Sequence, residues 1–265
     1  MGRIVVFGGS WGEVGMVGAS ALAANAALRS GAGLVQIITE REAMPIVAPL
    51  APCATTRCLP PDGDLAKLAV EFGADVVAIG PGLGQSIQPE RIVALLENFS
   101  GGIVVDADAL NALAKMGEWI ARWPKNVVIT PHPGELRRLL EGMGMSEQCD
   151  NSRIDAANAL ALRTKTTVVL KGQATVVTNG EQYYVNQTGN AGMATAGTGD
   201  VLTGMIAALM GQGLSAIDAG VLGVHAHGLA GDAAAAHFGR ISMTALDLLE
   251  SLAEAFCDLE HEAQR

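Results

Sequence analysis

The chain has 265 residues, of which 49% are hydrophobic and 17% are charged, and its formal net charge is −10 at pH 7. A general nucleic-acid binder needs a basic surface, so this acidic balance argues against that class of protein. The length suits one large core, and we expect a single domain over residues 1–265.

Neither the N-terminus nor the cysteines indicate export. Residues 3–7 form a short apolar run that leads into Gly8-Gly9, without the apolar segment of a signal peptide. No apolar run reaches the roughly 20 residues that a membrane helix needs. The four cysteines lack metal-ligand spacing and are few for a disulfide framework. We therefore expect a cytoplasmic protein with reduced thiols.

Short runs rich in Val and Ile alternate with helical patterns as far as residue 170. The runs cover residues 4–7, 34–38, 76–79, 103–105, 127–129 and 168–170. The helical patterns cover residues 19–29, 65–71, 90–97, 109–116, 134–141 and 154–163. This alternation predicts an α/β fold in three layers, with a mostly parallel sheet between two helical layers. Residues 175–178 and 182–185, joined by Asn179-Gly180, predict a small antiparallel hairpin at the edge, and the chain after residue 200 reads as almost wholly helical.

Polar or glycine-rich turns follow five of the predicted strands. The turns are residues 8–12, 80–84, 106–111, 130–135 and 171–175. In an open parallel sheet the carboxyl ends of the strands share one edge, where ligands bind. The five turns together predict an extended ligand that lies across this edge.

The segment 189–204, GNAGMATAGTGDVLTG, predicts a phosphate site. Four glycines fall within residues 189–199, Asp200 is the only acid of the segment, and an amphipathic helical run follows. Free N–H groups at a helix start, aided by the helix dipole, attract phosphate. The alternative is that Asp200 simply caps the helix, because Asp is common at that position. At a helix N-terminus the Asp200 carboxylate is expected to stay ionised.

Five motifs resemble those of the ADP- or ATP-dependent NAD(P)H-hydrate dehydratases of the ribokinase-like superfamily. They are GPGLG at 80–84, DADALN at 106–111, TPHPGE at 130–135, LKGQAT at 170–175 and GNAGMATAGTGDVL at 189–202. The segment 8–35 is also similar, so the resemblance extends from about residue 3 to about residue 235. It departs in the first loop, where Met16-Val17 precede Gly18-Ala19 and the family often has a tyrosine.

The resemblance implies an activity and its cosubstrates. Members of the family repair hydrated NADH or NADPH by phosphorylating the ring hydroxyl and expelling phosphate. The resemblance implies a ribokinase-like fold, Mg²⁺ and ADP as phosphoryl donor (ATP in eukaryotic members), with release of AMP. It also implies a homo-oligomer, with a tetramer favoured, and no metal ligand is firmly assigned.

The resemblance also implies a role for each matching residue. Asp200 is the catalytic residue that orients and deprotonates the hydroxyl. The hydrated nicotinamide substrate is assigned to Ala19, Gly82, Gly84, His132 and Asp200. The nucleotide is assigned to Lys171, Gly172, Gln173, Ala174, Thr175, Gly197, Thr198 and Gly199.

Several nearby residues allow two interpretations. Asp106 and Asn111 fit hydrogen bonds to ligand or metal, and Asp108 fits either that role or a plain turn. Glu135 fits a helix cap or a Mg²⁺ ligand, with the cap favoured. His225 and His227 suggest a metal site, but two-residue spacing on a helix points them about 200° apart, which does not suit one metal ion. We therefore expect both to be packing residues.

Two other functions remain open from the sequence. The first is a small-molecule hydroxyl kinase of the same superfamily, acting on a thiazole or pyrimidine alcohol. The second is a nucleotide-binding protein without catalytic activity. The TPHPGE and DADALN motifs favour the dehydratase over the kinase, and the intact GTGD sequence around Asp200 argues against the inactive protein.

Overall fold

The computed structural model describes residues 1–85, 87–117 and 126–264. Its centre is a nine-stranded sheet in the order β3-β2-β1-β4-β5-β6-β7-β8-β9. The strands are β1 Arg3–Phe7, β2 Leu34–Thr39, β3 Thr55–Cys58, β4 Val76–Ile79, β5 Gly102–Val105, β6 Val127–Ile129, β7 Thr167–Leu170, β8 Val176–Thr178 and β9 Tyr183–Val185. β3 to β7 are parallel to one another in this order, while β7, β8 and β9 pair antiparallel. The predicted α/β sheet and its edge hairpin are confirmed.

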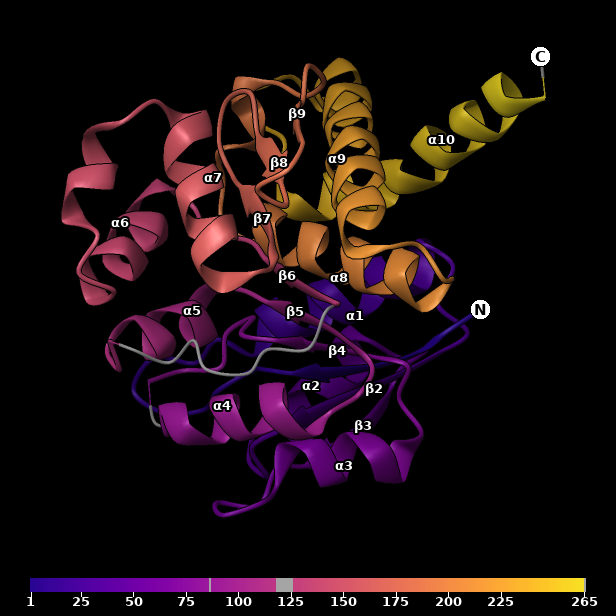
Figure 1. The fold of residues 1–265 in the computed structure, drawn as a ribbon. Coiled ribbons are helices and arrows are strands. Elements are labelled where there is room, and N and C mark those ends of the chain that lie inside the picture. Colours follow the sequence, from indigo (N-terminus) through magenta and orange to yellow (C-terminus); the bar gives the residue numbers. More distant parts are fainter. Residues whose placement is uncertain (86, 118–125, 265) are drawn as a thin grey trace.

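Helices cover both faces of the sheet (Figure 1). They are α1 Val17–Arg29, α2 Met44–Leu50, α3 Leu65–Phe72, α4 Pro89–Asn98, α5 Ala107–Ala114, α6 Pro133–Gly142, α7 Arg153–Thr164, α8 Thr198–Gly211, α9 Ala216–Phe238 and α10 Ala245–Ala263. Short 3₁₀ turns, η1 Ser146–Asp150 and η2 Ala191–Met193, precede α7 and α8. The helices α3 to α7 pack on one face, and α1, α2, α8 and α9 pack on the other. α10 adds an outer layer over α1, α8 and α9.

The alternating directions of strand side chains build these two cores. In β1, Val5 and Phe7 lie in the core under α3 to α7, whereas Ile4 and Val6 lie in the core under α1 and α8. A strand buried on both faces must be apolar throughout, which is why the sequence shows continuous Val and Ile runs there. Among the helices of the described residues, none has the length and apolarity required to cross a membrane.

Close packing of α1 against α8 fixes the position of the candidate site. A Cβ on Gly204 would lie 2.0 Å from the backbone oxygen of Ala23, so only glycine lets these helices approach so closely. The small buried side chains of α1, among them Ala23, Ala24 and Ala27, serve the same approach. This contact places the first turn of α8 beside the carboxyl ends of the strands.

The helix α2 and the strand β3 were not predicted from the sequence, and neither were the short 3₁₀ turns η1 and η2. Pro45 and Pro49 lie within α2 and hide its helical pattern. β3 is a short edge strand with the sequence TTRC and no fully buried residue, so it lacks the apolar run that marks the other parallel strands.

Candidate active site

The turns after β5, β6 and β7 meet at the start of α8. Asp106 follows β5 and Lys171 follows β7, and the Lys171 ammonium lies 2.5 Å from Oδ1 of Asp106. Thr203 of α8 donates its hydroxyl to Oδ2 of the same carboxylate at 2.7 Å. A Cβ on Gly199 would lie 3.4 Å from the Lys171 nitrogen. The predicted meeting of these turns with the Asp200 segment is therefore confirmed by geometry.

The Asp106–Lys171 pair is a buried ion pair. Asp106 is 1% exposed, and its two oxygens take one hydrogen bond each from Lys171 and Thr203. Burial alone would lower the pKa of Lys171, but the charges of Asp106 and Glu135 reverse this effect and raise the pKa above its ordinary value. Lys171 therefore stays a cation beside the start of α8, where it can face phosphate.

Asp200 occupies the third position of α8, not the cap. Gly197 is the cap residue, with a left-handed φ of 92° that favours glycine. Within the described residues the Asp200 carboxylate accepts no hydrogen bond. Burial, followed by the charge of Asp106, raises its pKa to about 7, against the opposing effect of Lys171. The expectation of a firmly ionised Asp200 was wrong, because burial and the charge of Asp106, which the sequence does not reveal, raise its pKa.

This raised pKa predicts a stability effect for Asp200→Asn. The unfolded carboxyl ionises near pH 4, while the folded one keeps its proton until about pH 7. The wild type therefore loses stability, relative to Asp200→Asn, as the pH rises through this interval. In urea unfolding, the free energy of unfolding of Asp200→Asn should exceed that of the wild type by more at about pH 8 than at about pH 5. An equal gain at both values would contradict the pKa assignment.

Glu135 and His132 start helix α6 as a capping box. The Nδ1 atom of His132 accepts the N–H of Gly134 at 3.0 Å and the N–H of Glu135 at 3.4 Å. In return, Oε2 of Glu135 accepts the His132 N–H at 2.8 Å. This confirms the cap for Glu135, which also lies 3.9 Å from Lys171. Burial raises the pKa of Glu135, while burial and the Lys171 charge lower the pKa of His132.

The segment from Lys171 to Thr175 forms an exposed turn after β7. Gly172 has a φ of 130°, and Ala174 has a φ of 52°, which is rare for a residue with a Cβ. The Thr175 hydroxyl closes the turn by donating to the Gly172 carbonyl at 2.9 Å. Gln173 is exposed. Backbone strain of this kind gathers at ligand sites, which agrees with the nucleotide role implied for the segment.

The glycines after β4 are needed for packing. A Cβ on Gly80 would lie 1.9 Å from the backbone oxygen of Asp106. A Cβ on Gly82 would lie 2.3 Å from the backbone oxygen of Met16 and 3.0 Å from the Ala19 Cβ. Gly84 donates its N–H to Oδ2 of Asp108 at 2.9 Å. These contacts join the loop after β4 to the start of α1 through Gly82 and Ala19, and to the turn after β5 through Gly84.

A family model described as NAD(P)H-hydrate dehydratase matches residues 4–254 of this chain. The chain belongs to the NAD(P)H-hydrate dehydratase family. It is 42% identical over 273 residues to a bifunctional NAD(P)H-hydrate repair enzyme of Moorella thermoacetica, covering 99% of this chain and 51% of the relative. It is 39% identical over 234 residues to an ADP-dependent (S)-NAD(P)H-hydrate dehydratase of Neisseria meningitidis, covering 87% of this chain and 76% of the relative. The chain spans about half the length of the bifunctional relatives.

Solved structures of the dehydratase family share the fold. An ADP/ATP-dependent NAD(P)H-hydrate dehydratase of Bacillus subtilis, co-crystallized with ATP and Mg²⁺ and soaked with CoA, superposes with a TM-score of 0.82 at 30% identity. The match covers 97% of this chain and 92% of that structure. The ribokinase-like fold implied by the sequence motifs is thus confirmed.

Four residues of this dehydratase-family site were assigned no site role from the sequence. Thr203 holds Asp106, and Ala107, with a φ of 44°, follows it in a strained conformation. Arg153 of α7 donates to the carbonyls of Leu170 and Lys171 at 3.2 Å, beneath the turn after β7. The sequence pointed to Asp106, because it follows a predicted strand. It gave no sign of Thr203 or Arg153, because their contacts join residues far apart in the chain.

His227 is the fourth such residue, and it has a role beyond packing. It is 8% exposed and its Nε2 lies 2.9 Å from the Thr198 carbonyl in the first turn of α8. Burial lowers the pKa of His227 to about 4, so the ring is neutral and Nε2–H donates to that carbonyl. The Thr198 hydroxyl in turn donates to the Met193 and Thr195 carbonyls. His227 thus supports the glycine segment from beneath.

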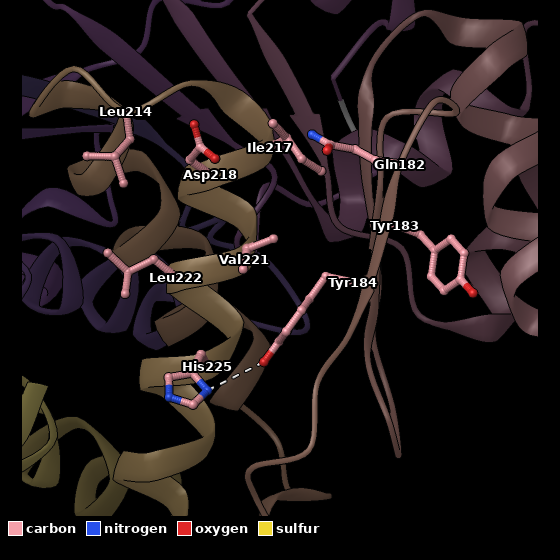
Figure 2. A pocket seen from close by; sticks show the side chains of 9 residues that line it. All are labelled: Gln182, Tyr183, Tyr184, Leu214, Ile217, Asp218, Val221, Leu222 and His225. Carbon is pink, nitrogen blue, oxygen red and sulfur yellow. Dashed lines mark hydrogen bonds between the residues drawn. The ribbon is translucent and has the colours of Figure 1, made fainter.

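Asn111 and His225 lie outside this hydrogen-bond network. Oδ1 of Asn111 accepts from the Arg138 guanidinium at 2.9 Å, which ties α5 to α6. His225 lines a hollow of about 520 Å³ between β9 and α9, where its Nδ1 lies 3.5 Å from the Tyr184 hydroxyl (Figure 2). No residue of this hollow was assigned to the site from the sequence.

Proposed function

We propose that this chain catalyses the ADP-dependent dehydration of hydrated NADH or NADPH and releases AMP and phosphate. One observation carries the proposal: in a member of the dehydratase family, the Asp200 carboxylate accepts no hydrogen bond from the described residues and lies at the start of α8 near the buried Asp106–Lys171 pair. A carboxylate with a pKa of about 7 suits proton transfer at neutral pH. The Neisseria relative is an ADP-dependent dehydratase, which supports ADP as the nucleotide.

The chemistry has two steps. In the first, Asp200 accepts the proton of the ring hydroxyl, the hydroxyl oxygen bonds to the terminal phosphorus of ADP, and AMP leaves. Lys171 and the free N–H groups at the start of α8 stabilise the negative charge on the transferred phosphoryl group. In the second, the ring nitrogen supplies an electron pair, the carbon–oxygen bond breaks, and phosphate departs. Loss of a ring proton then restores the reduced nicotinamide.

The two nucleotides would lie on opposite sides of Asp200. The turn from Lys171 to Thr175 and the segment from Gly197 to Gly199 would bind the phosphates of ADP. His132, Ala19, Gly82 and Gly84 would contact the hydrated dinucleotide. The His132 side chain is 49% exposed and lies on the turn after β6, whose Glu135 is 3.9 Å from the Lys171 nitrogen.

Mg²⁺ fits this site as a partner of the nucleotide. In the described part of the chain no cluster of three or more metal-binding side chains occurs, and Asp106 and Glu135 already have hydrogen-bond donors. Mg²⁺ commonly binds through substrate phosphates with one or two carboxylates and several waters. The ADP phosphates would hold the ion, with Asp200 as the nearby free carboxylate, and the ion would neutralise phosphate charge.

The decisive assay follows the return of reduced-nicotinamide absorbance from hydrated NADH. We expect turnover with ADP and Mg²⁺, equal amounts of AMP and phosphate as products, and slower turnover with ATP. Thiazole and pyrimidine alcohols incubated with ATP test the kinase alternative in parallel. Phosphorylation of an alcohol without any dehydration would overturn the proposal in favour of the kinase.

We further propose a cytoplasmic homo-oligomer, with a tetramer favoured as in the family. The hollow between β9 and α9 supports self-association, because partly exposed Leu214, Ile217, Val221 and Leu222 lie beside β9 at the sheet edge (Figure 2). An unpaired edge strand next to apolar side chains suits contact with another chain.

A further inference from the structure

A second cavity, of about 550 Å³, lies at the carboxyl ends of β1 to β4. We name it the distal pocket. Its lining includes Gly9, Glu40, Arg41, Leu59, Leu83 and Arg91. None of these residues belongs to the catalytic cluster around Asp200, and the volume suits a nucleoside with its phosphate.

The distal pocket and the catalytic cluster occupy the same edge of the sheet. Glu40 follows β2 and Asp106 follows β5, and these strands are three places apart in the sheet order. Neighbouring strands are about 4.8 Å apart, so the two sites are separated by roughly 14 Å. A dinucleotide extends over such a distance when it lies across the edge of an α/β sheet.

A continuous backbone floor joins the two sites. Gly9 and Ser10 donate their N–H groups to the Pro81 and Gly82 carbonyls at 3.0 and 2.6 Å. The loop after β4 therefore contacts the distal pocket through Leu83 and the turn after β5 through Gly84, which binds Asp108. A ligand bound at Asp200 can follow this floor toward β2.

The distal pocket has an apolar wall and a charged rim. Leu83 and Ile87 are 6% and 7% exposed, and Leu59 packs beside them. On the rim, the Glu40 carboxylate accepts the Trp11 N–H at 2.8 Å, while Arg41 is exposed and has no partner among the described residues. Such a wall suits a flat heteroaromatic base, a carboxylate suits ribose hydroxyls, and a free guanidinium suits phosphate.

We propose that the distal pocket binds the adenosine half of the dinucleotide substrate, whose nicotinamide half reacts at Asp200. This inference rests on the proposed function and assigns the end of the substrate that does not react. ADP, as phosphoryl donor, would occupy the other side of Asp200, against the turn after β7. The remote half would contribute binding energy to the ground state and the transition state alike, so its loss would raise KM and leave kcat unchanged.

Truncating the substrate is the first test. Hydrated, reduced nicotinamide mononucleotide carries the reacting ring but lacks the adenosine half. We expect its kcat/KM in the wild type to be about tenfold or more below that of hydrated NADH. Equal kcat/KM values for the two substrates would overturn the inference and leave the proposed function intact. Failure of the wild type to turn over either hydrate would instead refute the proposed function.

Leu59→Glu tests the pocket itself, with Val70→Glu as a matched control on the exposed face of α3. The introduced carboxylate should repel the substrate phosphates and raise KM for hydrated NADH about tenfold, without changing kcat or the KM for ADP. The KM and kcat for the truncated substrate should not change in Leu59→Glu. No kinetic parameter should change in Val70→Glu, since Val70 is 62% exposed and is not part of the pocket lining.

Arg41→Ala is a second pocket variant, and the core should stay intact because Arg41 is exposed. It should also raise the KM for hydrated NADH. Unchanged KM in both pocket variants would contradict the inference.

Cys58 supplies a readout that is independent of turnover. Its thiol lines the distal pocket, whereas Cys257 is exposed on α10. Alkylation followed by peptide mass spectrometry should show that NADH protects Cys58 and leaves Cys257 unprotected. Reduced nicotinamide mononucleotide should protect neither thiol. Equal labelling of Cys58 with and without NADH would refute occupation of the pocket, whatever the outcome of the kinetic assays.

Discussion

Asp200→Asn is expected to lower kcat for dehydration by about 10²–10⁴-fold, because general-base assistance is typically worth that much. Asparagine keeps the shape of the side chain and its place in the first turn of α8 but cannot accept the hydroxyl proton. ADP affinity should change little, since Lys171 and the glycine segment remain. The rate of recovery of reduced-nicotinamide absorbance and a nucleotide-binding titration measure these two quantities.

Asp218→Asn is a matched control for this variant. Asp218 occupies the same third position in α9, where its carboxylate accepts the Ser215 hydroxyl at 2.5 Å. Its carboxylate takes no part in the hydrogen bonds of the Asp106–Lys171 pair, so its substitution should leave kcat unaltered. Because Asp218 lines the hollow between β9 and α9, the oligomeric state of the variant is compared with that of the wild type first. If Asp200→Asn retained the wild-type kcat, the assignment of Asp200 as the proton acceptor would be wrong.

Asp106→Ala is expected to destabilise the fold by about 3–5 kcal/mol, because removal of one member of a buried ion pair leaves the other charge uncompensated. The variant removes the hydrogen-bonded carboxylate of Lys171, leaves Glu135 at 3.9 Å as a weaker counter-charge, and deprives the Thr203 hydroxyl of its acceptor. Removing both charges in Asp106→Ala/Lys171→Met should restore part of the loss. Urea-induced unfolding at constant pH gives the four free energies of this double-mutant cycle.

The exposed pair Arg57–Glu71 provides the comparison. It has an N–O distance of 2.6 Å, similar to the buried pair, but both side chains are more than one third exposed. Arg57→Ala should therefore cost less than about 1 kcal/mol. Similar losses in Asp106→Ala and Arg57→Ala would show that burial does not determine the strength of the Asp106–Lys171 interaction.

Much of the scaffold could be predicted from the sequence because its strands are buried on both faces. Such strands must be apolar throughout, so the runs before Gly8, Gly80, Asp106, Thr130 and Lys171 marked both the sheet and the turns at its edge. α2 and β3 lie at the margin of the sheet, where burial constrains the sequence less, and these were missed.

The electrostatics of the site could not be predicted in the same way. The pKa of Asp200 depends on burial and on Asp106, which approaches from a different part of the chain. Thr203 and His227 lie within apolar helical stretches, and only the folded arrangement shows that they hold Asp106 and the Thr198 carbonyl. A local pattern can indicate that a carboxylate starts a helix but cannot give the charges that other strands bring beside it.

The capping box of α6 also fixes the tautomer of His132. Because Nδ1 accepts two backbone N–H groups, the neutral ring carries its proton on Nε2. That nitrogen lies 3.3 Å from Glu135 and can offer a ligand only a donor. Turning the ring over would remove the acceptor of both N–H groups in the first turn of α6, so the same hydrogen bonds that cap the helix also fix the orientation of the imidazole.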